Sequence, residues 1–216
     1  NQLLNDTLRY LCVVLPFAVL IIVLREEVVT LIYMRGAFTR GDVLMTAPVL
    51  GWLMLGAVAF ASQTVVNRGF YALQNTLLPA AYGTLAVIAS IPIYYAGQHW
   101  MGVEGVGLAV SLSALVQVAL LYGIWNRRSQ NRGSGAVYRF FFKMALLCLP
   151  LGAGLWGLRA WVGGWLATGT FAGALATVAL VGSAFLLLLL VLGYGFRMGE
   201  ITRLLERLPI RPRHHR

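Results

Sequence analysis

Six long apolar stretches limit what this chain can fold into more than any other feature. An α-helix needs about 20 mostly apolar residues to cross the hydrocarbon core of a bilayer, and each stretch is close to that length. Of the 216 residues, 59% are hydrophobic and 11% are charged, whereas soluble domains carry about 25% charged residues. We therefore predict an all-α polytopic membrane protein with about six transmembrane helices and a short interfacial helix after the first. The expected spans are residues 10–24, 43–66, 77–97, 106–125, 140–158 and 171–196.

The basic residues indicate how these spans are oriented, because cytoplasmic loops carry an excess of lysine and arginine. The chain has 17 such residues and a net charge of +10. Only Arg25, Arg35, Arg40 and Arg159 fall on the side of the membrane opposite the N-terminus. We therefore place both termini in the cytoplasm, as an even number of spans requires. This topology accounts for the positive charge, so no nucleic-acid partner is predicted.

Residues 197–216 form a basic segment after the last span. Its apolar residues Ile201, Leu204, Leu205 and Leu208 recur at helical spacing. This pattern predicts a short amphipathic helix on the cytoplasmic face, where its arginines would meet anionic lipid.

The sequence shows no arrangement of residues that is typical of an enzyme. It contains no HExxH, GxSxG or P-loop motif, and none of its seven acidic residues lies in the middle of a span. Cys12 and Cys148 lie in apolar stretches without CxxC spacing, which is typical of small buried side chains. Catalytic, metal and cofactor sites are therefore not predicted. For Arg25, Glu26 and Glu27, at the far membrane face, we expect local salt bridges.

The most informative polar residues lie at the cytoplasmic end of the second span and in the turn after it. Gln63, Asn67 and Arg68 would be costly against lipid, so they should face the bundle interior or a hydrated cavity. Together with Asn75 they are candidate contacts for a polar headgroup. For Arg68 two interpretations stay open. It either pairs bidentately with a phosphate or extends to the interface and serves only the topology.

Three segments of the sequence are informative beyond their composition. They are MRGAFTRGD at 34–42, RGFYALQNTLLP at 68–79 and GVGLAVSLSALVQ at 105–117. Each resembles a segment of the MurJ/MviN family of lipid II flippases, and their order and separation also match. The resemblance covers most of the chain up to about Arg128, and the last two spans match in position and character. The residues that carry the motifs are Gly36, Phe38, Arg68, Phe70, Tyr71 and Pro79.

The resemblance implies an architecture. The family belongs to the multidrug/oligosaccharidyl-lipid/polysaccharide exporter (MATE/MOP) superfamily, with two helical lobes around a cavity and two extra C-terminal helices along a lipid groove. Residues 1–128 would then be part of the C-terminal lobe with four spans. Residues 129–196 would be the two additional transmembrane helices, and residues 197–216 a basic cytoplasmic tail. Because the family is about twice this length or more, we expect a segment of a longer chain that lacks the N-terminal lobe.

The resemblance also implies a function, which is transport and not enzyme catalysis. In the bacterial cytoplasmic membrane, an undecaprenyl-pyrophosphate-linked disaccharide-peptide would be moved across the bilayer by alternating access. Arg68 is the motif residue expected to contact substrate, whereas Phe70, Tyr71 and Pro79 are expected to shape the turn. Coupling to the membrane potential or to a monovalent cation is implied for the family. The family's usual Asp and Thr in the turn are Asn75 and Leu78 here, and no residue is assigned to a cation.

Two alternative functions stay open at this point. One is export of another lipid-linked sugar, such as an O-antigen or exopolysaccharide precursor, or of a drug by the same superfamily. The other is a membrane scaffold or degenerate half-protein without transport activity.

Overall fold

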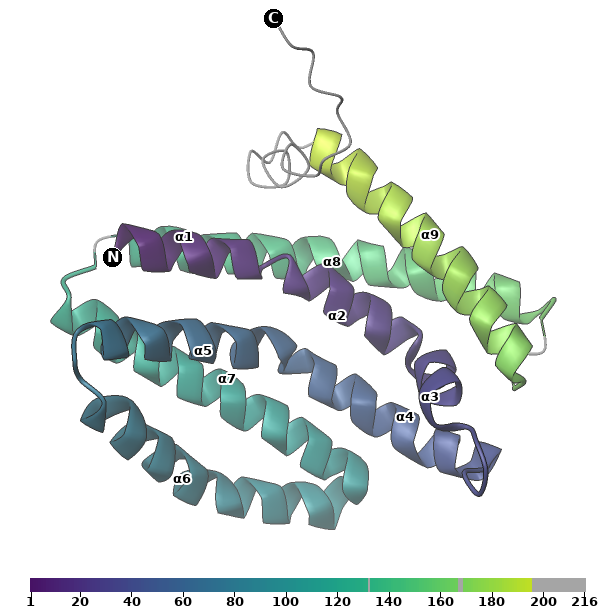
Figure 1. Ribbon diagram of the computed structural model, residues 1–216, viewed down its shortest axis with the longest axis horizontal. Helices are drawn as coiled ribbons and strands as arrows, with labels where there is room; N and C mark the ends of the chain where they lie inside the picture. The colour runs from purple at the N-terminus through teal and green to yellow at the C-terminus, as the bar shows by residue number, and fades with distance from the viewer. Residues whose placement is uncertain (132, 167–168, 196–216) are drawn as a thin grey trace, which may run out of the picture.

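The computed structural model describes residues 1–131, 133–166 and 169–195, which form nine α-helices and no strand. This agrees with the expected all-α class. Figure 1 shows long helices running roughly side by side, with α9 leaning away from the others. The helices are α1 (Gln2–Leu11), α2 (Val14–Val23), α3 (Arg25–Tyr33), α4 (Arg40–Leu55), α5 (Ala57–Ala72), α6 (Leu77–Met101), α7 (Val103–Arg128), α8 (Ser134–Gly163) and α9 (Phe171–Gly195).

Five helical segments are long and apolar enough to cross a membrane, and the bent pair of α4 and α5 makes a sixth. About six spans were expected, so the count is confirmed by length and composition. The short helix expected after the first span is α3. The predicted start of the first span at Tyr10 was wrong, because the helical run Gln2–Val23 begins eight residues earlier. The polar residues of α1 lower its mean hydropathy, so the hydropathy pattern does not reveal this helix, although its Leu4 and Leu8 are buried.

The second span is broken at Gly56, where α4 and α5 meet at 43°. A helix break frees backbone carbonyls, which must find donors inside a membrane. Ser111 of α7 supplies one, because its hydroxyl donates to the carbonyl oxygens of Trp52 at 2.7 Å and Leu53 at 3.2 Å. A Cβ at Gly56 would lie 2.7 Å from Ser111 Oγ. The glycine therefore lets α7 approach closely enough for Ser111 to donate to the carbonyl groups that the break frees.

Helices α6 and α7 form an antiparallel hairpin joined at Gly102, and α6 packs chiefly against α7 (Figure 1). The two helices almost touch at one point. A Cβ at Gly97 of α6 would lie 2.5 Å from the carbonyl oxygen of Gly105 in α7. Small residues at such crossings let helices pack through their backbones, which is a common device in membrane bundles.

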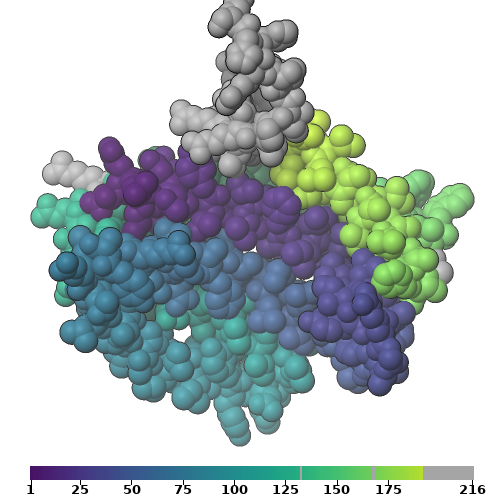
Figure 2. Space-filling model, in the orientation of Figure 1, coloured from purple at the N-terminus to yellow at the C-terminus, as the bar shows by residue number. Residues whose placement is uncertain are grey.

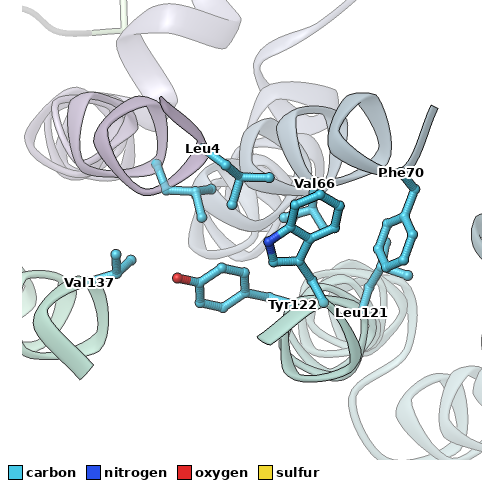
Figure 3. Packing of buried hydrophobic residues seen from close by; sticks show 8 residues of the cluster. Leu4, Val66, Phe70, Leu121, Tyr122 and Val137 are labelled. Atoms are coloured by element: carbon cyan, nitrogen blue, oxygen red, sulfur yellow. The ribbon is translucent and has the colours of Figure 1, made fainter. Parts of the chain in front are cut away.

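The two larger buried clusters join the helices of the bundle. The first joins α1, α5, α7 and α8 through eight side chains, and Figure 3 shows Tyr122 and Val137 facing one another beneath Leu4. The second joins α2 to α8 and α9 through Val23, Leu155 and Phe185. In Figure 2, the α1–α2 run and the α4–α5 pair lie side by side across the visible face. The amphipathic helix predicted at residues 197–216 lies outside the described residues.

Candidate functional site

Helix α5 carries three of the four predicted substrate contacts. Its buried face, with Ser62, Val66 and Phe70, packs toward α7. Arg68 lies on the opposite side and is exposed, as its neighbours on that face, Thr64 and Tyr71, also are. Within the described part of the chain, the Arg68 guanidinium has no hydrogen bond or ion pair.

Gln63 and Asn67 flank this exposed face. They are one helical turn apart and therefore lie on the same side of α5, where both are half-buried. Helix α5 thus presents an amide pair next to an uncompensated guanidinium. Such a surface can donate several hydrogen bonds to an anionic or sugar-bearing headgroup.

The turn after α5 places Asn75 differently. Its side-chain oxygen accepts a hydrogen bond from the Leu78 N–H at 3.2 Å, and its own N–H donates to the Phe70 carbonyl at 3.1 Å. Asn75 therefore holds the start of α6. Phe70 is buried and meets the Trp125 ring edge-on at 5.1 Å between centroids. Pro79 is buried in the first turn of α6. Phe70 and Pro79 are thus packed on either side of the turn, and their role in shaping it stays a prediction.

A cavity of about 270 Å³ lies beside this turn. Asn75 and Arg128 line it together with Phe70, Leu73, Trp125 and Ser129. The fold thus brings Asn75 next to a cation from the end of α7, whereas Arg68, Asn67 and Gln63 are not among the lining residues. Sequence reasoning had used Arg128 only for the topology, and its place in a basic run was the one signal available.

The first motif forms the connection between α3 and α4. Gly36 has φ +61°, a left-handed conformation that favours glycine. Thr39 then caps α4, donating to Asp42 Oδ2 from its backbone N–H and its hydroxyl, each at 2.7 Å. These two bonds hold the pKa of Asp42 below its ordinary value. Phe38 packs against the cluster of Val29, Val43 and Ala47. Gly36 and Phe38 therefore build a turn.

An ion-pair network lies at the far end of the bundle from the N-terminus. Arg159 of α8 donates from Nε to Glu27 at 2.8 Å and reaches Glu26 at 3.4 Å, and Arg40 lies 3.3 Å from Glu26. The expectation of local salt bridges was wrong, because the partner of Glu27 lies 132 residues away. Glu27 is 1% exposed. Helix packing decides this pairing, since α8 passes close to α3 only in the folded bundle.

Comparison with known proteins places these motifs in a family. The model of the family described as lipid II flippase MurJ matches residues 1–177, most of the chain. The chain belongs to this MurJ family. A probable lipid II flippase MurJ of Vibrio cholerae is 28% identical over 183 residues, which is 83% of this chain and 35% of the relative. The lipid II flippase MurJ of Thermosipho africanus is 30% identical over 122 residues, covering 56% of this chain and 26% of that protein.

A solved structure described as lipid II flippase MurJ in an inward closed conformation shares the fold. It aligns with a TM-score of 0.65 at 24% identity and covers 86% of this chain and 38% of that one. The chain thus spans about a third of the length of the MurJ proteins it matches. The predicted match to the C-terminal part of this family agrees with that coverage.

A second polar network in this MurJ-family chain escaped sequence reasoning. Asn5 of α1 and Asn131 of the α7–α8 loop are both buried. They exchange amide hydrogen bonds, and Asn5 Oδ1 also accepts the Tyr122 hydroxyl at 2.8 Å. Nearby, Trp125 donates from Nε1 to Asn1 Oδ1 at 3.1 Å. The network fixes the end of α7 and the following loop against α1.

Proposed function

We propose that this chain is the C-terminal part of a transporter that moves lipid II across the bacterial cytoplasmic membrane by alternating access. The observation that carries the proposal is the family match over residues 1–177. The apolar spans and the similar fold support it. The substrate is the undecaprenyl-pyrophosphate-linked disaccharide-peptide. The missing partner is the N-terminal lobe of the same polypeptide, in keeping with coverage of 35% of the Vibrio cholerae relative.

The exposed face of α5 is the part of this chain best suited to meet that substrate. A guanidinium without a counter-ion and two amides are unfavourable against lipid. Arg68, Asn67 and Gln63 therefore belong at a surface that is hydrated or covered by the other lobe. A pyrophosphate would offer Arg68 two oxygen acceptors in the geometry that its fork prefers. We assign Arg68 to the headgroup and the two amides to its sugars or phosphates.

In this proposal the two extra helices form a functional unit separate from the lobe. We assign residues 1–128 to the C-terminal lobe, residues 129–196 to the additional helices that border the lipid groove, and residues 197–216 to a cytoplasmic tail. Both termini of the segment face the cytoplasm. The protein uses no organic cofactor, and transport draws on the membrane potential or a monovalent cation.

Complementation tests the proposal directly. The full-length coding sequence that includes this chain is expressed in bacteria depleted of their own lipid II flippase. We expect growth to be restored. Membrane insertion without growth would contradict lipid II transport and would favour a scaffold. Restoration of O-antigen or exopolysaccharide export in matching export mutants, without rescue of lipid II depletion, would favour a different exporter of the superfamily.

A further inference from the structure

Three basic side chains converge on a cavity between α1 and α8, away from the α5 face. The cavity has a volume of about 280 Å³ and is lined by Arg9, Ala136, Arg139, Phe140 and Lys143. The four α8 residues fall at spacings of three, four and seven, so they share one side of that helix. Arg9 reaches the cavity from α1, which packs against the same part of α8.

The charge of this cavity is not neutralised from within the described bundle. The nearest acid is Asp6, whose Oδ1 lies 3.8 Å from Arg9 Nη1, at the outer limit of an ion pair. Arg9 Nε is buried and has no hydrogen-bond partner in the described residues. Arg139 and Lys143 are exposed and form no ion pair there. Of the three cations, Arg9 alone has a carboxylate within 4 Å among the described residues.

The position of the cavity along α8 matches a headgroup layer. Helix α8 has 30 residues, which makes it about 45 Å long against a hydrocarbon core of about 30 Å. From residue 144 to residue 158 it carries no charge, and this apolar part is about 22 Å long, which covers most of the core. Arg139 and Lys143 precede it, and their long side chains reach the membrane surface. Phe142, 73% exposed beside them, marks the lipid-facing side.

We propose that the Arg9–Arg139–Lys143 cavity binds the phosphate of an anionic lipid headgroup. A phosphate supplies the acceptors that Arg9 Nε and the two exposed cations lack. Ala136 leaves room for the headgroup, and Phe140 offers an apolar wall to the glycerol or isoprenoid part below it. Basic pockets between transmembrane helices are a recurring form of such recognition. The same phosphate chemistry occurs in bilayer phospholipids and in pyrophosphate-linked polyprenyl lipids, and the site fits both sources.

Native mass spectrometry of the purified protein in detergent tests this site. Phosphatidylglycerol and phosphatidylcholine are titrated separately, and retained lipid is counted for the wild type, Arg139→Gln, Lys143→Gln and the double variant. We expect selective retention of phosphatidylglycerol by the wild type and a loss of roughly fivefold per removed charge, the typical effect of one basic residue at an anionic surface. Undecaprenyl pyrophosphate is titrated in a second arm. Tighter retention of it assigns the site to a lipid-linked substrate, and the reverse assigns it to bilayer phospholipid.

Two controls keep the test decisive. Arg127→Gln removes an exposed arginine from the nearby end of α7, outside the cavity lining. An equal loss in that variant would mean diffuse surface attraction and would overturn the site. Arg139→Lys with Lys143→Arg keeps the charge and should keep most of the binding. Wild-type retention of phosphatidylglycerol by a well-folded Arg139→Gln/Lys143→Gln protein would also overturn it.

Discussion

Asn5 and Asn131 lie 126 residues apart in the sequence and exchange two amide hydrogen bonds of 2.9 Å. Each side chain both donates to and accepts from the other, and both are buried. The α7–α8 loop is thereby fixed to the first helix of the segment. The connection from α7 to α8 starts from this pair, so its rigidity depends on two side chains whose sequence context gives no hint of their pairing.

A double-mutant cycle measures this pair. Asn5→Ala, Asn131→Ala and the double variant should each lower stability, with a coupling free energy of about 0.6–1.7 kcal/mol, the range for hydrogen bonds between membrane helices. Unfolding by SDS in mixed micelles gives the values. Asn67→Ala is the matched control, because Asn67 is half-buried and has no hydrogen bond among the described residues. Strictly additive effects would contradict a direct pair.

Arg159 should contribute more to the stability of the fold than its position near the end of α8 suggests. Arg159→Ala leaves Glu27, 1% exposed, without the donor at 2.8 Å. Removing one partner of a buried ion pair costs about 3–5 kcal/mol, because the remaining charge has lost its compensation. Thermal unfolding in detergent should show a large fall for Arg159→Ala and little change for the exposed Arg35→Ala.

The double variant Glu27→Leu/Arg159→Leu checks the cause of that loss. It removes both charges and should recover much of the stability. If the double variant were as unstable as Arg159→Ala, the loss would come from packing and not from the uncompensated carboxylate.

The contrast between these contacts and the spans shows what the sequence can predict. The spans were predictable because each depends on a local sum of side-chain hydropathy, and α6 to α9 begin and end near the expected residues. The start of the first helix was not, because Asn5, Asp6 and Arg9 lower the hydropathy of a helix whose apolar face is nevertheless buried. Pairs such as Glu27 with Arg159 depend on which helices become neighbours, and no local pattern encodes that.

The features of the candidate site also differ in whether the sequence could predict them. The motif at 68–79 predicted a turn, and Phe70 and Pro79 lie in the two helices on either side of it, but their function in shaping the turn stays a prediction. The exposure of Arg68 depends on which helices become its neighbours, whereas the hydrogen bonds that Asn75 makes at the start of α6 are local to the turn. The basic cavity of Arg9, Arg139 and Lys143 joins residues far apart in the chain, so it became visible only in the folded bundle.

Gly97 should tolerate no side chain. Gly97→Ala would set a methyl group 2.5 Å from the Gly105 carbonyl oxygen, so α6 and α7 must separate, at a cost of about 1–3 kcal/mol. Gly157→Ala is the matched control, because nothing lies within 4 Å of a Cβ there. It should be neutral or slightly stabilising, since alanine favours the helix. Melting temperatures in detergent separate the two, and equal effects would contradict the close crossing.

The Asp42 cap predicts a pH dependence. Its pKa is lowered by the hydrogen bonds from Thr39, so the folded state favours the ionised form. The resulting stabilisation is fully present above the unfolded pKa near 3.8 and is lost as pH falls through the lower folded value. The melting-temperature gap between wild type and Asp42→Ala should therefore be constant near neutrality and shrink in acid. A gap that widens in acid would contradict the assigned sign.

Arg68 gives the most direct test of the substrate site. Its guanidinium is exposed on α5 and has no ion pair within the described ranges, so Arg68→Ala removes no hydrogen bond or ion pair there and should leave membrane insertion and melting temperature unchanged. If the guanidinium binds pyrophosphate, lipid II translocation by the full-length protein should fall by at least tenfold, because charge-assisted bonds contribute about 1.5–3 kcal/mol. Arg68→Lys keeps the charge without the bidentate fork and should be intermediate. Thr64→Ala, on the same exposed face, controls for general disturbance. Wild-type translocation by Arg68→Ala would leave the guanidinium as an interfacial anchor that serves only the topology.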